Sequence, residues 1–428
     1  MKIFAEFDLI IMFQLRFLKL LSLSVGIATL LGSCEPSNQP FECADAIGCV
    51  TIPPGEPIKI GVLQTLSGGS APGGIDQTRT IELVVEQRNN RLLDRPIILQ
   101  VEDDRCSPEG GANGALRIVA DPQAIAILGT NCSGAAVTAG KIMSEAGLVM
   151  ISSANTAPSL TAVGNTQGQD WQPGYFRVIY NDATTGKVAA EFARWVLGID
   201  DVATLDMDNL YSQSLTQIFR QSFSNIGGKI VFSGTINPED TDLKPVLKAV
   251  FNSPGKLLFF PFGEPGKGLL LMRQAKSMLD SEEGKNMMFL GGEALMSEQF
   301  IGQVGNDGIG IYIAGPALVS SPEIEALESA YQSKYKEPPL TALYSFASDA
   351  TNLLLDTIAA VAIAEPDGTL HIARQSLREA LYSTANFPGL TGKITCDRFG
   401  DCGAIKFNIY RLDNPKEGVK GLSRNIVY

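Results

Sequence analysis

Two hydroxyl-bearing residues, Ser133 and Thr156, stand at the ends of neighbouring predicted strands. Ser133 opens a helix whose first turn is rich in small residues, and Thr156 lies in the polar turn after the next strand. A helix start presents backbone N–H groups without partners and a dipole that favours negative charge. We therefore predict that this stretch, which begins at Asn131, binds an anionic group. Taken singly, Ser133 is also an ordinary helix N-cap, and Thr156 an ordinary turn cap.

An acidic and an aromatic residue hold corresponding positions further along the chain. Glu293 follows the strand end at Leu290–Gly292, and Tyr211 lies where a loop enters a helix. A glutamate in a loop is commonly solvated, but one that faces an anion site is a natural partner for an ammonium group. Because crevices form at the strand ends of α/β sheets, we predict that these residues share one ligand site with Ser133 and Thr156.

Catalytic chemistry has little support in this sequence. His371 is the single histidine, so a Ser-His-Asp triad would have to include it, and its surroundings predict a surface position at the start of a helix. No GxSxG motif occurs, and the glycine-rich stretch 67–74 lacks the Lys-Ser/Thr of a phosphate-binding loop. No cysteine spacing matches a CxxC metal site. We predict a binding protein with no enzymatic activity, no cofactor and no metal.

The overall charge argues against one class of partner. The formal net charge is −12 and the isoelectric point is near 4.8. Binding to nucleic acid requires a concentrated basic face, and no stretch of the sequence supplies one. We expect a monomer whose ligand is a small molecule and not a nucleic acid.

Strands and helices must alternate to bring the candidate residues together, and the sequence predicts that they do. From Ile58 onward short apolar runs alternate with amphipathic segments, and the same alternation begins again after Tyr180. Strict rotation of this kind is typical of a doubly wound parallel sheet. With 428 residues we expect two such α/β lobes, joined by crossings near Tyr180, Ala314 and residues 402–406. The expected lobes are 57–180 with 315–404 (lobe 1) and 181–314 with 405–428 (lobe 2).

The N-terminus carries the pattern of an export signal. An apolar run over Leu20–Leu31 follows basic residues and ends in small residues directly before Cys34. This ending resembles the bacterial lipobox, so we expect Cys34 to carry lipid and residues 1–33 to be removed. The run is short for a membrane span, which needs about 20 residues. Residues 34–56 are expected to be a flexible tether that holds the protein at the membrane, facing the periplasm or the cell exterior.

Six further cysteines follow Cys34, and an even number in an exported chain predicts disulfides. Two pairs are close in sequence, and elimination gives the third, so the expected disulfides are Cys43–Cys49, Cys396–Cys402 and Cys106–Cys132. Residues 397–401 have the composition of a turn. We expect the chain to close with a hairpin between 393–395 and 404–410.

Many weak motifs occur in the order typical of one known family. They are TLSG at 65–68, VEDD at 101–104, ISSANTAPSL at 151–160, FR at 176–177, DTDL at 240–243, MRQA at 272–275 and LTGKI at 390–394. Over about Ile58 to Tyr410 the chain thereby resembles the type I periplasmic binding proteins of branched-chain amino acid transport. The resemblance implies a two-lobe receptor that closes on a small ligand and passes it to a permease of the ABC class. A receptor that signals to a membrane partner without transport is the alternative.

The resemblance also implies how an amino acid would bind. Ser133, Ala154 and Thr156 would hold its α-carboxylate through hydroxyls and backbone N–H groups. Glu293 would hold its α-ammonium, and Tyr211 would line the second lobe. The family's lobe 1 disulfide falls on the pair predicted above by elimination.

Two places depart from the family pattern. Gly73 stands where relatives often carry an aromatic residue in the first loop, and Phe262-Gly263-Glu264 stands where they often show Gly and Tyr. Both changes alter the expected pocket wall, so the resemblance does not fix the side chain of the ligand. Glu264 would either favour a second positive group on the ligand or face solvent.

Overall fold

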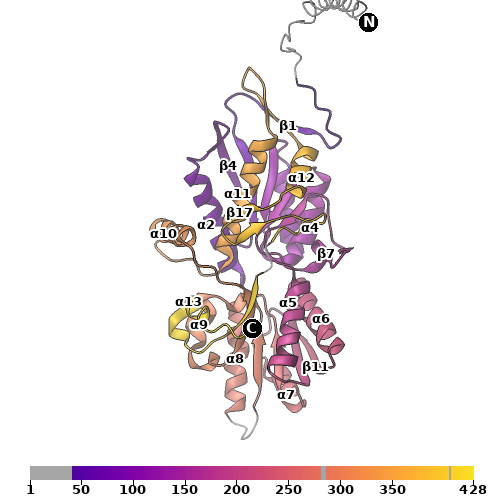
Figure 1. Ribbon diagram of the computed structural model, residues 1–428, viewed down its shortest axis with the longest axis vertical. Coiled ribbons are helices and arrows are strands. Elements are labelled where there is room, and N and C mark those ends of the chain that lie inside the picture. The colour runs from indigo at the N-terminus through magenta and orange to yellow at the C-terminus, as the bar shows by residue number, and fades with distance from the viewer. Residues whose placement is uncertain (1–40, 281–285, 404–405) are drawn as a thin grey trace, which may run out of the picture. The chain divides into compact units, whose positions relative to one another are not determined.

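Two six-stranded sheets dominate the structure between Cys43 and Tyr428 (Figure 1). The structure is a computed structural model, and it describes residues 41–280, 286–403 and 406–428. Each sheet is mostly parallel and is packed between helices, which confirms the predicted pair of doubly wound α/β lobes. The expected signal segment 1–33 and Cys34 lie outside the described residues.

The sheet of lobe 1 has the order β3-β4-β2-β5-β6-β9, and all its neighbours are parallel except β3 and β4. Its strands are β2 (Ile58–Gln64), β3 (Arg91–Leu92), β4 (Arg95–Asp103), β5 (Ala124–Gly129), β6 (Val149–Ser152) and β9 (Tyr175–Arg177). Its helices are α2 (Ala71–Gln87), α3 (Pro108–Val119), α4 (Ser133–Glu145), α10 (Pro322–Tyr335), α11 (Leu343–Val361) and α12 (Arg374–Tyr382). Ile60 and Val62 pack in one core cluster and Leu63 in another, so β2 is covered on both faces.

The sheet of lobe 2 has the order β11-β10-β12-β13-β14-β19, and only β14 and β19 are antiparallel neighbours. Its strands are β10 (Asp201–Met207), β11 (Lys229–Ile236), β12 (Leu257–Phe260), β13 (Met288–Gly291), β14 (Tyr312–Pro316) and β19 (Phe407–Arg411). Its helices are α5 (Asp182–Glu191), α6 (Leu210–Asn225), α7 (Lys244–Asn252), α8 (Pro265–Leu279), α9 (Glu298–Val304) and α13 (Gly418–Leu422), with a π-helical turn at Phe192–Val196 and a 3₁₀ turn, η3, at Glu293–Leu295. Phe219 and Phe259 stack in one of its two core clusters.

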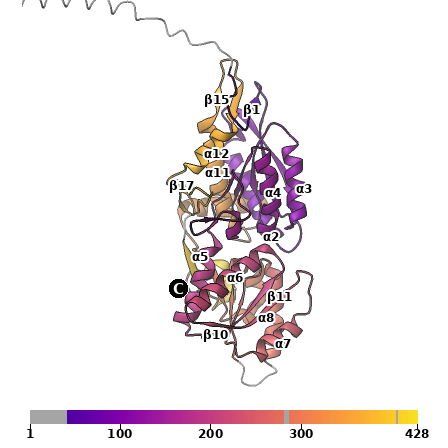
Figure 2. The ribbon, with the colours of Figure 1, turned by 90° about the vertical axis from the view of Figure 1, so that its right-hand side faces the viewer.

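The expected closing hairpin is wrong. β18 (Gly392–Ile394) pairs with β17 (Phe387–Gly389) in lobe 1, whereas β19 pairs with β14 in lobe 2. The two segments therefore belong to different sheets, because the chain passes from lobe 1 to lobe 2 between them. Residues 404–405 of this passage lie outside the described residues. Figure 2 shows β17 beside α11 and α12 of lobe 1, whereas β10 and β11 lie in the other lobe.

The part of the expected tether nearest to lobe 1 is in fact folded. β1 (Cys49–Ile52) pairs in antiparallel register with β16 (Leu370–Ala373), and Val50 and Ile52 are buried in the core of lobe 1. Burial of the apolar side chains in the segment CVTI stabilises this strand, although the residues around it have the composition of a flexible linker. β16 also holds His371, which is buried and bonded to Thr51 and Glu365. The predicted helical surface position of His371 is therefore wrong.

Three disulfides join the cysteines that the sequence pairs: Cys43–Cys49, Cys106–Cys132 and Cys396–Cys402. The first fastens the entry of β1, the second joins the starts of α3 and α4, and the third lies beside the passage to β19. Across the described ranges, no helix combines the length and the apolar character needed to cross a membrane.

Candidate functional site

Ser133 and Thr156 come together at the carboxyl ends of β5 and β6. Ser133 is the first residue of α4, and its Oγ accepts a hydrogen bond of 3.3 Å from the backbone N–H of Ala157. The N-cap residue, Cys132, gives the helix no side-chain bond, so N–H groups of the first turn remain without helical partners. In the described part of the chain, the N–H of Thr156 makes no hydrogen bond either. This edge of lobe 1 therefore offers several donors to an anion.

Asp182, which the sequence analysis did not single out, adjoins this pair. It is the fully buried first residue of α5, where the chain enters lobe 2. Thr156 donates its hydroxyl to Asp182 Oδ2 at 2.6 Å, and the Asp182 N–H donates to the Thr156 carbonyl at 3.0 Å. The Thr185 hydroxyl lies nearby, but neither it nor Asp182 Oδ1 completes a hydrogen bond within the described residues. One oxygen of a buried carboxyl group is thus left for a ligand.

Glu293 and Tyr211 supply the lobe 2 side of the site. Glu293 begins η3 directly after β13, and Tyr211 belongs to the first turn of α6. Tyr211 Oη donates to Glu293 Oε2 at 2.7 Å. Two glycines make room for the ring, because a Cβ on Gly292 would lie 2.7 Å from Tyr211 Oη and one on Gly263 would lie 3.2 Å from Tyr211 Cδ1. The Tyr211 ring therefore lies along the backbone from Gly292 to Gly263.

These residues are called the inter-lobe site from here on: Ser133, Thr156, Asp182, Tyr211 and Glu293. The electrostatics of this site favour a cation. Burial raises the pKa of Glu293 to about 8, and the negative charge of Asp182 adds to the rise. Burial likewise raises the pKa of Asp182 to about 6, against the lowering effect of the Thr156 hydroxyl and of Arg177. Tyr180 lies close enough to feel both charges, and its buried hydroxyl has no partner among the described residues. Two carboxyl groups close enough to influence each other electrostatically are both stabilised by an ammonium group placed between them.

Asn131 and Ala154 already have partners within lobe 1. Asn131 accepts a 2.6 Å bond from Gln77 Nε2 and donates to the Ser70 carbonyl at 3.3 Å. The Ala154 N–H donates to Ser152 Oγ at 3.1 Å. Asn131 therefore fixes the loop before α2, and the amide of Ala154 is not among the unoccupied donors.

Glu264 faces the other lobe, whereas Gly73 does not. Gly73 lies in the first turn of α2, where a Cβ would meet Leu343 and Asn131 at 3.1 and 3.2 Å. The glycine opposite lobe 2 is instead Gly69, whose Cβ would lie 2.4 Å from Glu264 Oε2. A side chain at Gly73 would therefore meet residues of lobe 1, and the role of this position in the pocket wall stays a prediction.

A buried arginine braces the loop that carries Thr156. The fully buried Arg177 donates to two backbone carbonyls of that loop at 3.1 and 2.9 Å, and its Nε pairs with Asp401. Asp401 also accepts a 2.9 Å bond from Asn181, the N-cap of α5. The Arg177–Asp401 ion pair thus connects three segments. They are the Thr156 loop, the first crossing between the lobes at Asn181, and the segment that precedes the third crossing.

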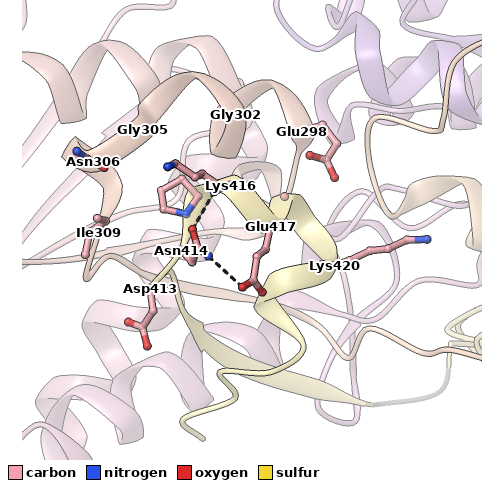
Figure 3. Close-up of a pocket in the computed structure, with 12 residues that line it drawn as sticks. Glu298, Gly302, Gly305, Asn306, Ile309, Asp413, Asn414, Lys416, Glu417 and Lys420 are labelled. Atoms are coloured by element: carbon pink, nitrogen blue, oxygen red, sulfur yellow. Dashed lines mark hydrogen bonds between the residues drawn. The ribbon is translucent and has the colours of Figure 1, made fainter.

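Other hollows lie away from the inter-lobe site. A pocket of about 810 Å³ is lined by residues of α9 and of the segment 413–420 (Figure 3). Within this pocket Asn414 donates to Glu417 and accepts from the Lys416 N–H. A groove of about 440 Å³ lies between α10 and α13. Neither contains a residue of the inter-lobe site.

Comparison with known proteins places this chain in a family. A model of the periplasmic binding proteins matches residues 57–410. The Leu/Ile/Val-binding protein BraC3 of Rhizobium johnstonii is 24% identical over 363 residues, which cover 84% of this chain and 92% of that protein.

Solved structures share the fold. The branched-chain amino acid transporter substrate binding protein LivJ of Streptococcus pneumoniae, in complex with isoleucine, has a TM-score of 0.71 and 22% identity, covering 84% of this chain and 97% of that one. A solute binding protein of an ABC transporter from R. palustris, in complex with benzoate, has a TM-score of 0.70 and 21% identity, covering 83% and 93%. Since the family model spans most of the sequence, this chain belongs to the periplasmic binding protein family.

Proposed function

We propose that this protein is the solute receptor of an ABC transporter and that it captures an amino acid or a related compound between its two lobes. The family match supports a binding role, and the name of the Rhizobium relative supports an amino acid as the ligand class. A structurally similar solute binding protein is in complex with benzoate, so other small carboxylates are also candidate ligands. All of these ligands share a carboxylate, which is the group that the start of α4 suits.

One observation carries the choice of an amino acid: the inter-lobe site combines N–H donors that have no hydrogen-bond partner among the described residues with the carboxyl groups of Asp182 and Glu293. The Ser133 hydroxyl, the first turn of α4 and the Thr156 N–H would hold the α-carboxylate. Asp182 and Glu293 would hold the α-ammonium, with Tyr211 keeping the Glu293 carboxyl group in place. The Ala154 N–H already donates to Ser152 Oγ, so it is not among these donors. A zwitterion satisfies both halves at once, whereas benzoate would leave the two acids unpaired.

Binding of this kind would bring the lobes together. The carboxylate contacts belong to lobe 1 and the ammonium contacts to lobe 2, so a ligand that makes both favours the conformation in which the lobes are close. Asp182 already accepts a hydrogen bond from Thr156 at the first crossing between the lobes, so it would contact the ligand where the two lobes meet. The permease would then distinguish the closed receptor from the empty one.

The proposal is tested by a thermal-shift screen of the mature protein against amino acids, their amides and small carboxylates, followed by calorimetry. A ligand that binds only the folded state raises the melting temperature. Amino acids should raise it, while the matching amides and amines without the carboxylate should not. Stabilisation by benzoates but by no amino acid would refute the zwitterion assignment.

We also infer that the mature protein is a monomeric lipoprotein anchored through Cys34 and facing the periplasm or the cell exterior. The support is the apolar run before Cys34 and the extracytoplasmic setting of the family. A Cys34→Ser variant should lose its membrane association on cell fractionation while it keeps ligand binding. Retention of that variant on membranes would contradict the anchor, and light scattering of the soluble form would check the monomer.

A further inference from the structure

A third acid, Glu264, stands beside the inter-lobe site and has no partner. It is the half-buried N-cap residue of α8, and its side chain gives that helix no capping bond. Among the described residues the side chain of Glu264 makes neither a hydrogen bond nor an ion pair, although its backbone carbonyl accepts bonds from the N–H groups of Lys267 and Gly268. Burial raises the pKa of Glu264, with Lys267 lowering it and Glu239 raising it by smaller amounts. Lys267 is itself bonded to the Asp240 carbonyl at 2.7 Å.

The position of Glu264 is set by contacts between the two lobes. The carbonyl of Gly263 accepts a 3.4 Å bond from Ser70 Oγ of lobe 1. Glu264 Oε2 comes so near to Gly69 that a Cβ there would lie 2.4 Å away. The bare backbone of Gly69 is therefore what gives this carboxylate room. A carboxylate that simply faced solvent would not approach the opposite lobe in this way.

The ring of Tyr211 connects the two ends of this region. Its hydroxyl meets Glu293, and its Cδ1 edge packs on Gly263, the residue directly before Glu264. The length of a phenol ring thus separates the place of the α-ammonium from the neighbourhood of Glu264. A short chain of methylene groups would cover that distance along the ring face, where a terminal cation also gains from the aromatic ring.

From this geometry we infer that the inter-lobe site is built for a basic amino acid such as lysine or ornithine, whose side-chain cation pairs with Glu264. The inference rests on the proposed function, because it needs the α-ammonium held between Asp182 and Glu293. Asp182 gives independent support, since its fully buried Oδ1 has no hydrogen-bond partner among the described residues. If Asp182 and Glu293 share the α-ammonium, Glu264 is left without a positive partner, and a second positive group on the ligand would pair with it.

Calorimetry of the full mature protein with lysine, ornithine and norleucine tests the inference. Norleucine has the methylene chain of lysine without the terminal ammonium. Lysine or ornithine should bind at least about tenfold more tightly than norleucine, as expected for a charged contact that is partly withdrawn from water. Glu264→Gln should remove that preference and leave norleucine affinity within about twofold. Glu239→Gln, which removes an exposed acid near Glu264, is the matched control and should keep the preference.

Each outcome separates the inference from the function on which it rests. Equal affinity for norleucine and lysine, or a lysine preference that survives Glu264→Gln, overturns the role of Glu264 but leaves an amino acid receptor. Failure of every α-amino acid to bind overturns both. Melting curves of the two variants should match that of the wild type, because each change is isosteric and neither residue packs in a core.

Discussion

Replacing Glu293 by glutamine should remove much of the pH dependence of the stability of the ligand-free protein. A carboxyl group whose pKa is raised in the folded state keeps its proton where the unfolded chain has lost it. The protonated Glu293 side chain therefore makes its full contribution to the free energy of unfolding at pH values below 4.5, the pKa in the unfolded chain. This contribution is lost as the pH rises through the folded-state pKa of about 8. Each pKa unit corresponds to about 1.4 kcal/mol, so ionisation of Glu293 should lower the free energy of unfolding by about 5 kcal/mol above that range.

Urea unfolding at a series of pH values measures this effect directly. In the wild type the free energy of unfolding should fall from mildly acidic to mildly alkaline pH. In Glu293→Gln the fall should be smaller, and part of what remains comes from Asp182, whose pKa burial also raises. Glu239→Gln, an exposed change, should follow the wild type. Parallel curves for Glu293→Gln and the wild type would refute the reasoning, because they would mean that burial does not hold the proton on Glu293.

Three further predictions concern the groups around the site. Ser133→Ala should weaken amino acid binding by about 1–2 kcal/mol in calorimetry, because one donor is lost, and normal affinity would count against its contact with the carboxylate. Asp401→Asn leaves Arg177 buried without its counter-charge and should lower the free energy of unfolding by about 3 kcal/mol in urea titrations, whereas a loss below about 1 kcal/mol would contradict the ion pair's role. Replacing both Cys43 and Cys49 by serine should speed amide exchange in β1 with little change in ligand affinity, and unchanged exchange would show that the disulfide does not fasten the strand.

The strand ends and their polar residues could be predicted from the sequence because they depend on local patterns. Ser133 and Thr156 each follow an apolar run, and parallel strands bring such positions to one edge. The hydrogen bond from the Ala157 N–H to Ser133 Oγ confirms that the two loops meet. Their role toward a ligand stays a prediction, as does that of Glu293.

What the sequence analysis missed depends on three-dimensional context. In the sequence Asp182 resembles any acidic residue at the start of a helix. Only its position directly after the predicted crossing at Tyr180 indicates that it could lie between the lobes. Gly73 and Gly69 are four residues apart, and only the start of α2 at Ala71 decides which of them faces lobe 2. β1 escaped notice because its partner, β16, lies more than three hundred residues further along the chain.

The docking of β1 on β16 also determines where a pull on the N-terminus is felt. Because Cys43 is bonded to Cys49 and β1 is paired along its whole length, such a pull enters the molecule through lobe 1. The passages between the lobes start at Val178 and beyond, outside that line of force. Lobe 2 therefore lies outside the route by which this pull is transmitted. If the protein is held by its N-terminal end, it is held through lobe 1, and the closure proposed above would displace lobe 2 relative to that end.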